Sequence, residues 1–166
     1  MQTIHQSLFG MTNPTQTQFL YGFTQGTLRR YRPIKDAAGQ TTGYRSAGAV
    51  AGFGDVRGLA LIASDARKDV FLATTRTGAL LTVTVPTTSP MRTSAARLRN
   101  TGWKSYRALV PTTCGNTVAV MAVDDRGYGR VFTVGRLAGL RTTVTAAPRT
   151  VDVRGLRALA PGTQMP

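Results

Sequence analysis

The chain has 166 residues, a hydrophobic fraction of 42% and a formal net charge of +14. Its length fits a single domain and its hydrophobic fraction fits an ordinary globular core, so composition disfavours a disordered protein. Threonine, valine and glycine abound while glutamate is absent, which favours half-buried strands over helices.

The N-terminal segment, MQTIHQSLFGM, lacks the basic region and the long apolar run of a signal peptide. No stretch of the sequence approaches the ~18 consecutive apolar residues of a membrane-spanning helix. Cys114 is the only cysteine, so an intrachain disulfide is excluded and the redox compartment stays undecided. The sequence therefore predicts no membrane span and leaves the localisation unknown.

Strand-like runs follow one another along the rest of the chain, joined by turns with glycine, threonine and proline. The segment TGALLTVTVP alternates apolar and threonine side chains, as expected for a strand with one buried face. The runs fall into groups of four, and glycine turns at Gly26, Gly78 and Gly127 separate the second run of a group from the third. In chain order the runs after the N-terminal segment are Phe19 to Phe23, 28–33, 43–50, 56–64, Val70 to Thr74, 80–86, 94–100, 103–111, Val118 to Val123, 130–136, 140–147 and 153–161.

One phrase recurs along the chain: VRGLALIAS at 56–64, WKSYRALVP at 103–111 and VRGLRALAP at 153–161. Ile62, Leu109 and Leu159 within it are separated by 109 − 62 = 47 and 159 − 109 = 50 residues. A period near fifty with four strands per unit is typical of a β-propeller blade. We therefore predict an all-β fold, a β-propeller with four-stranded blades of about 50 residues and three blade-equivalents per chain. A β-trefoil is the alternative.

The whole chain, 1–166, is predicted to form a single repeat domain. Its approximate units are 7–55, 56–102 and 103–152, with 153–166 completing a shared blade. Propellers have about 4–8 blades, so three units cannot close a ring. We expect a homo-oligomer, a dimer with a six-bladed ring, in which 7–12 of one chain meets 156–161 of its partner.

The run from Gly102 to Leu109, followed by Val118 to Val123 and Gly127, resembles the blade of tachylectin-type propeller lectins, Gly-Trp-x-x-aromatic-x-x-Leu followed by a turn, a strand and a glycine turn. The run from Phe19 to Phe23 with Gly26 and Tyr31 is similar to the second half of that blade. The resemblance implies a propeller with pockets between blades that bind N-acetylated hexosamines. It also favours an extracellular or cell-surface location. Only Trp103 carries the tryptophan of the motif, and Val56 and Val153 are expected in its place elsewhere.

Sugar recognition needs an aromatic face and paired hydrogen-bonding groups. The candidate ligand-binding residues are Tyr44, Arg99, Asn100 and Trp103, although core packing is the main alternative for Trp103. Trp103 and Tyr106 lie three residues apart, which would place them on opposite faces of a regular strand.

Catalysis is not expected. His5 and Cys114 are the only histidine and cysteine, too few for a zinc site, and no cofactor motif is present. Asp124 and Asp125 are expected to bind the amides of their own turn rather than calcium.

The sequence thus favours a non-enzymatic, lectin-like propeller that binds a glycan or glycoconjugate between blades. The alternative is a structural docking module whose arginine-rich surface binds an acidic partner or polyanion. Nucleic acid binding is less favoured, because the basic residues are not interleaved with aromatic ones on one face.

Overall fold

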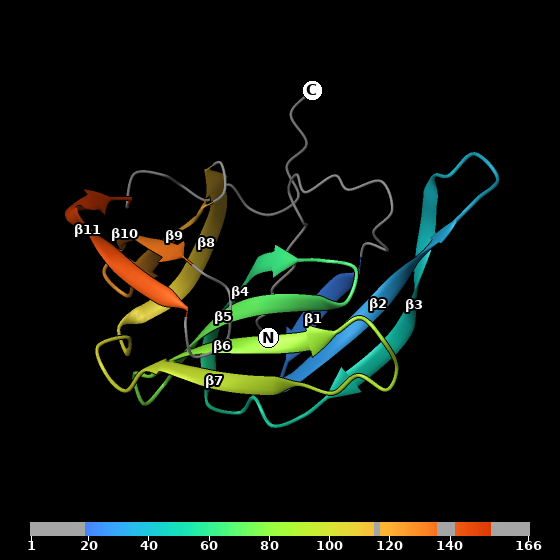
Figure 1. Cartoon of the computed structure of the whole chain (residues 1–166), viewed down its shortest axis with the longest axis horizontal. Helices are drawn as coiled ribbons and strands as arrows, with labels where there is room; N and C mark the ends of the chain where they lie inside the picture. The colour runs from blue at the N-terminus through green and yellow to red at the C-terminus, as the bar shows by residue number, and fades with distance from the viewer. Residues whose placement is uncertain (1–18, 115–116, 136–141, 154–166) are drawn as a thin grey trace.

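The computed structural model describes residues 19–114, 117–135 and 142–153 (Figure 1). These residues form eleven strands and no helix, so no helix of the described ranges could cross a membrane. The strands belong to three separate antiparallel sheets, each made of strands that are consecutive in the sequence. The predicted all-β class is confirmed.

The first sheet contains β1 (Leu20–Thr24), β2 (Thr27–Lys35) and β3 (Thr41–Val50) in the order β1-β2-β3. A two-residue turn joins β1 to β2, and its residues Gln25 and Gly26 have φ angles of 49° and 71°. Positive φ at both central residues is typical of a tight hairpin turn that matches the twist of the strands. The hairpin of β2 and β3 extends away from the other sheets (Figure 1).

The second and third sheets have four strands each, again in sequence order. The second sheet consists of β4 (Val56–Ser64), β5 (Lys68–Thr75), β6 (Leu80–Pro86) and β7 (Ser94–Arg99). The third sheet consists of β8 (Tyr106–Cys114), β9 (Thr117–Asp124), β10 (Tyr128–Gly135) and β11 (Thr143–Asp152).

The second sheet lies between the other two, because apolar clusters cover both of its faces. One face, with Leu59, Phe71 and Val83, packs in a cluster with Phe19, Tyr21 and Leu28 of the first sheet. The other face, with Ala60, Ile62 and Leu72, packs with Leu109, Val120 and Phe132 of the third. Burial on both faces explains the continuous apolar runs at 59–63 in β4 and 70–73 in β5.

The three sheets repeat the same internal contact, and its donor residues are 50 residues apart in the sequence. The amides of Phe53, Trp103 and Val153 donate to the carbonyls of Gly26, Gly78 and Gly127 respectively, at 2.9, 3.0 and 3.1 Å. Phe53, and not Val56, is therefore the structural equivalent of Trp103, which corrects the alignment expected from sequence. Val56 instead matches Tyr106. The strand register shifts directly after each of them, in the pairing of β4 with β5 and in the pairing of β8 with β9.

The described strands form three open sheets and no closed barrel, so the β-trefoil alternative disagrees with the structure. Stacked antiparallel sheets are also what a propeller requires. A central axis and a closed ring go beyond these contacts, and the propeller itself remains our proposal.

Candidate functional site

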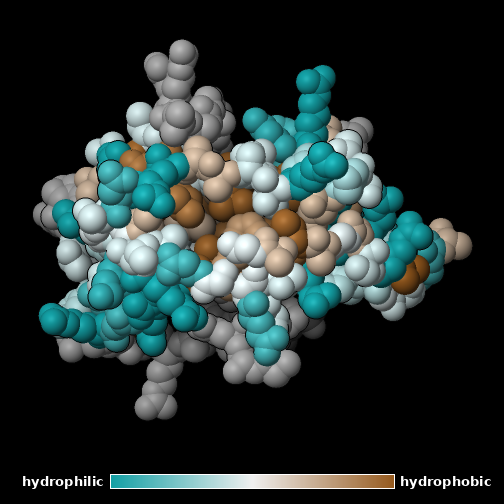
Figure 2. Space-filling view, turned by 90° about the horizontal axis from the view of Figure 1, so that it is seen from below, coloured by the Kyte–Doolittle hydropathy of each residue, from teal (hydrophilic) through white to brown (hydrophobic). Residues whose placement is uncertain are grey.

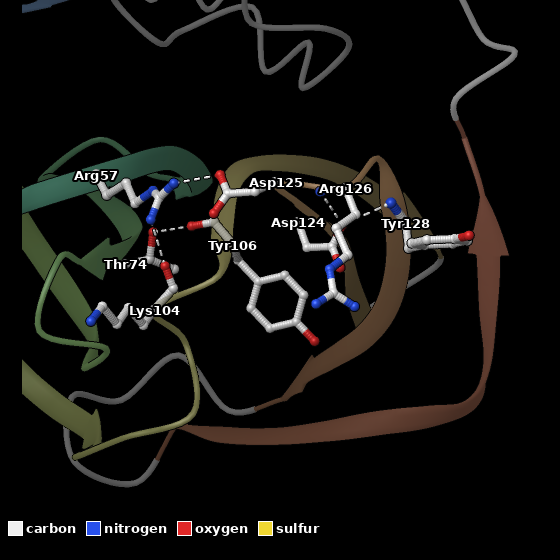
Figure 3. Close-up of polar contacts among 8 residues, drawn as sticks. All are labelled: Arg57, Thr74, Lys104, Tyr106, Asp124, Asp125, Arg126 and Tyr128. Carbon is white, nitrogen blue, oxygen red and sulfur yellow. Dashed lines mark hydrogen bonds and ion pairs between the residues drawn. The ribbon is translucent and has the colours of Figure 1, made fainter.

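The junction between the second and third sheets is held by polar contacts around Arg57 (Figure 3). The guanidinium of Arg57 donates to the carbonyl oxygen of Lys104 at 2.7 Å and forms an ion pair with Asp125. The hydroxyl of Thr74 donates to the carbonyl oxygen of Tyr106 at 3.2 Å. β4 and β8 approach closely here, since a Cβ atom added to Gly58 would lie 3.2 Å from the carbonyl oxygen of Arg107.

Asp124, which ends β9, and Asp125, which follows it, have structural roles. Asp124 accepts hydrogen bonds from the backbone amides of Arg126 and Tyr128, both at 2.9 Å, and so holds the turn into β10 (Figure 3). Asp125 faces the second sheet through Arg57. The expectation that both aspartates bind the amides of their own turn is confirmed for Asp124. It does not hold for Asp125, whose carboxylate pairs with Arg57 instead. Among the described residues, no group of three or more potential metal ligands lies together.

A buried polar cluster lies between the first and second sheets. The hydroxyl of Tyr21 donates to the carboxyl group of Asp69, and the hydroxyl of Ser64 donates to the same group at 2.5 Å. Burial, reinforced by Asp69, raises the pKa of Tyr21 far above its ordinary value, and Arg30 opposes this shift only in part. Tyr21 therefore stays neutral and works as a hydrogen-bond donor.

Arg30 in β2 is only 2% exposed. Its guanidinium donates to the carbonyl oxygens of Pro86, Thr88 and Ala47 at 2.5, 3.1 and 3.3 Å. The same group lies over the ring of Phe19, 4.5 Å from its centroid. Arg30 thus joins the end of β6 and the loop after it to β3 of the first sheet, and its burial keeps the guanidinium away from any ligand at the surface.

Trp103, the aromatic candidate from sequence, is a core residue with 6% exposure. Its ring lies 4.5 Å from that of Phe132 and 5.2 Å from that of Tyr106. The expectation that Trp103 and Tyr106 lie on opposite faces is wrong, because β8 begins only at Tyr106 and a turn separates the two residues. A sugar ring could stack on Trp103 only by displacing these neighbours.

The other candidate residues lie in two different sheets. Tyr44 is in β3, where 54% of it is exposed. Arg99 ends β7, and its guanidinium donates to the carbonyl oxygen of Val144 in β11 at 3.2 Å. Asn100 follows Arg99 and is exposed. Arg99 and Asn100 thus lie at the junction of the second and third sheets, whereas Tyr44 lies in the projecting hairpin of β2 and β3.

The same hairpin carries a pair of arginines that sequence reasoning did not single out. Arg32 in β2 is the direct cross-strand partner of Arg45 in β3, and both are exposed. Directly opposed residues share one face of a sheet, with Cβ atoms about 4.5–5.5 Å apart, and like charges there are destabilising. The guanidinium of Arg32 lies 5.5 Å from the ring centroid of Phe19. We call these two residues the Arg32–Arg45 pair.

The surface is not uniformly polar. Seen from below, apolar side chains gather in the middle of the molecule, with hydrophilic side chains on both sides of them (Figure 2). The exposed large apolar residues of the described ranges are Ile34, Tyr44, Val110 and Val151. Two of these four lie on the same hairpin as the Arg32–Arg45 pair.

In comparisons with known proteins, no family model, no curated protein and no solved structure matches the chain.

Proposed function

We propose that the protein is a non-catalytic recognition module of the β-propeller type that binds an anionic glycan through the Arg32–Arg45 pair. The observation that carries the proposal is the direct opposition of two exposed arginines across β2 and β3. A sulfate or carboxylate bound between the two guanidiniums would remove their repulsion, and each guanidinium offers a planar fork that suits such oxyanions.

The surroundings support a site with a fixed geometry. Phe19, which is 4% exposed, lies beneath the guanidinium of Arg32 and limits its orientations. Arg30, two residues earlier on the same face, is held by three carbonyl oxygens. The pair lies close to the contact of the first sheet with the β6–β7 loop of the second, so the proposed ligand would bind beside a junction between sheets. A neutral N-acetylated hexosamine is less well supported, because the indole of Trp103 is covered.

Binding to immobilised heparin and to an array of sulfated and neutral glycans tests the proposal. The double variant Arg32→Ala/Arg45→Ala is compared with Arg76→Ala/Arg126→Ala, which removes the same charge from two exposed turn positions. Because a hydrogen bond to a charged group contributes about 1.5–3 kcal/mol, the first variant should lose at least about tenfold in affinity. The control should lose much less.

Equal losses in the two variants would show non-specific attraction to net charge and would refute the site. Preference for an acidic peptide or for DNA over every sulfated glycan would refute the glycan. Competition by free N-acetylhexosamine, with no effect of the Arg32→Ala/Arg45→Ala change, would instead favour a neutral-sugar lectin.

A further inference from the structure

The third sheet has an apolar outer face, on the side away from the second sheet. Side chains on β8, β9 and β10 alternate between the core and this face, so the cross-strand row of Val110, Met121 and Val131 lies outside. Val110 is 48% exposed, and Met121 and Val131 are half-buried. A neighbouring row pairs Ala108 with Val123 and Gly129 with Val151, and Val151 is 45% exposed.

The equivalent face of the second sheet is fully buried inside the chain. The 50-residue spacing equates Ala60 with Val110, and the pairings of these residues equate Leu72 with Met121. Ala60 and Leu72 are both 0% exposed, because the third sheet covers them. The outer face of the third sheet therefore repeats, in position and in apolar character, a surface that elsewhere in this chain packs against a further sheet.

Arg107, at the edge of this surface, also indicates that a further sheet packs against it. It lies 50 residues after Arg57 and follows Tyr106 as Arg57 follows Val56. Arg57 reaches the next sheet through Asp125 and the carbonyl oxygen of Lys104. Arg107 is exposed, and within the described ranges its side chain has no hydrogen bond to a further sheet.

The first sheet has the complementary outer face. Leu20 pairs with Tyr31 across β1 and β2 on the side away from the second sheet, and Gly22 lies beside the Tyr31 ring, since its added Cβ atom would be 3.5 Å from that ring. The equivalent pair of the second sheet is Phe71 and Val83, each 1% exposed because the first sheet covers them. Leu20 and Tyr31 remain half-buried.

We propose that a second copy of this chain docks on the outer face of the third sheet, and that it does so with the outer face of its own first sheet. The contact would continue the sheet-on-sheet interface that already occurs twice within the chain. It is a head-to-tail contact, and such contacts close into rings when the rotation allows. Two copies would supply six sheets, within the range of about 4–8 blades for closed propellers. The Arg32–Arg45 pair lies on the opposite face of the first sheet, so this association does not depend on the anion site.

The test is the mass of the purified chain in solution, measured by light scattering over a range of concentrations. The expected mass is twice the 17.7 kDa of one chain. In the variant Val110→Asp, a charge replaces an exposed apolar side chain at the centre of the proposed contact, and the mass should fall to that of one chain with an unchanged circular dichroism spectrum. The control Ala95→Asp, at an exposed position of β7, should keep the mass of the unmodified protein.

A second variant keeps the proposal testable if Val110→Asp fails to fold. Arg107→Glu changes an exposed side chain, and it should weaken the association by at least about tenfold if Arg107 repeats the role of Arg57. A mass of 17.7 kDa at every concentration would overturn the proposal. An association that neither variant weakens would overturn it as well.

Discussion

Arg57, near the start of β4, forms an ion pair with Asp125 in the turn between β9 and β10, and this pair joins the second sheet to the third. The side chains are 30% and 50% exposed, so water and salt screen the attraction. The hydrogen bond from the Arg57 guanidinium to the Lys104 carbonyl oxygen, at 2.7 Å, acts beside it. The junction therefore combines a weak ion pair with a short hydrogen bond to an uncharged acceptor.

Removal of the two partners should have unequal effects. Arg57→Ala loses both the ion pair and the bond to Lys104, and we expect the free energy of unfolding to fall by about 1–2 kcal/mol. Asp125→Asn keeps the bond to Lys104 and should cost less than about 1 kcal/mol. Urea unfolding at low and high salt measures both values. A larger loss in Asp125→Asn than in Arg57→Ala would contradict this assignment.

Gly58 is predicted to be essential for the approach of β4 to β8. In Gly58→Ala, the new Cβ atom would lie 2.9 Å from the Thr74 hydroxyl oxygen and 3.2 Å from the Arg107 carbonyl oxygen. The sheets would have to move apart, at a cost of about 1–3 kcal/mol. Gly54→Ala is the matched control, because its Cβ atom would meet nothing within 4 Å. Equal stabilities of the two variants in thermal unfolding would argue against the close contact.

Tyr21→Phe should be destabilising below about pH 10 and less so above it. The variant loses the hydrogen bond to Asp69, a buried group, which costs about 1–3 kcal/mol. Folding raises the pKa of Tyr21, so the unfolded chain releases this proton first. The stabilisation is therefore complete below the unfolded pKa of about 10 and falls as the pH rises further, by up to about 1.4 kcal/mol per pH unit.

The measurement for Tyr21 is the difference in unfolding free energy between Tyr21→Phe and the unmodified protein at about pH 8 and about pH 11. Other tyrosines and lysines titrate in both proteins and cancel from the difference. We expect the difference to shrink at the higher pH. If it stays constant, the Tyr21 hydroxyl does not have the buried environment described above.

Trp103 should behave as a core residue and not as a sugar platform. Trp103→Ala is expected to reduce the free energy of unfolding by about 3–5 kcal/mol. Trp103→Phe, which introduces the residue found at the equivalent position 53, should cost much less. Folded Trp103→Phe should also retain its affinity for heparin. A loss of glycan binding in folded Trp103→Phe would place Trp103 in the ligand site.

Much of the fold could be predicted because the repeat and the glycine turns are local features. Gly26, Gly78 and Gly127 have φ angles of 71°, 94° and 84°, which favour glycine, and the chain shows them at nearly regular intervals. The alternation around Leu80–Pro86 likewise predicted a strand, but the expectation that only one of its faces is buried is wrong, because no residue of β6 is exposed and Thr82 is only 2% exposed. These signals predicted antiparallel strands in sequence order.

The exact equivalence between units was harder to predict. Asp55–Leu59 and Asp152–Leu156 are identical in sequence, and this match suggested that Val56 corresponds to Val153. The hydrogen bonds to the turn glycines instead equate Phe53 with Val153. Identity of a short segment therefore did not determine its place in the sheet, because the position is fixed by backbone contacts with the preceding turn.

The buried Arg30 and the Arg32–Arg45 pair depend on contacts that sequence does not display. The run Leu28-Arg29-Arg30-Tyr31-Arg32 contains a signal in retrospect, since alternation from the buried Leu28 places Arg30 and Arg32 on the inner face. Two of the three partners of Arg30, Pro86 at the end of β6 and Thr88 in the loop after it, lie 56 and 58 residues away. The pairing of Arg32 with Arg45 depends on the length and register of the hairpin, which composition does not determine.

The central claim is that the second sheet is packed between the first and the third. Nuclear Overhauser effects on the labelled protein test it most directly. The rings of Tyr21 in β1 and Phe71 in β5 have centroids 4.9 Å apart, so cross-peaks between their protons are expected. Cross-peaks are also expected between Gly58 in β4 and the backbone of Arg107 and Ala108 in β8. Their absence, with the cross-strand peaks within each sheet intact, would contradict the stacking.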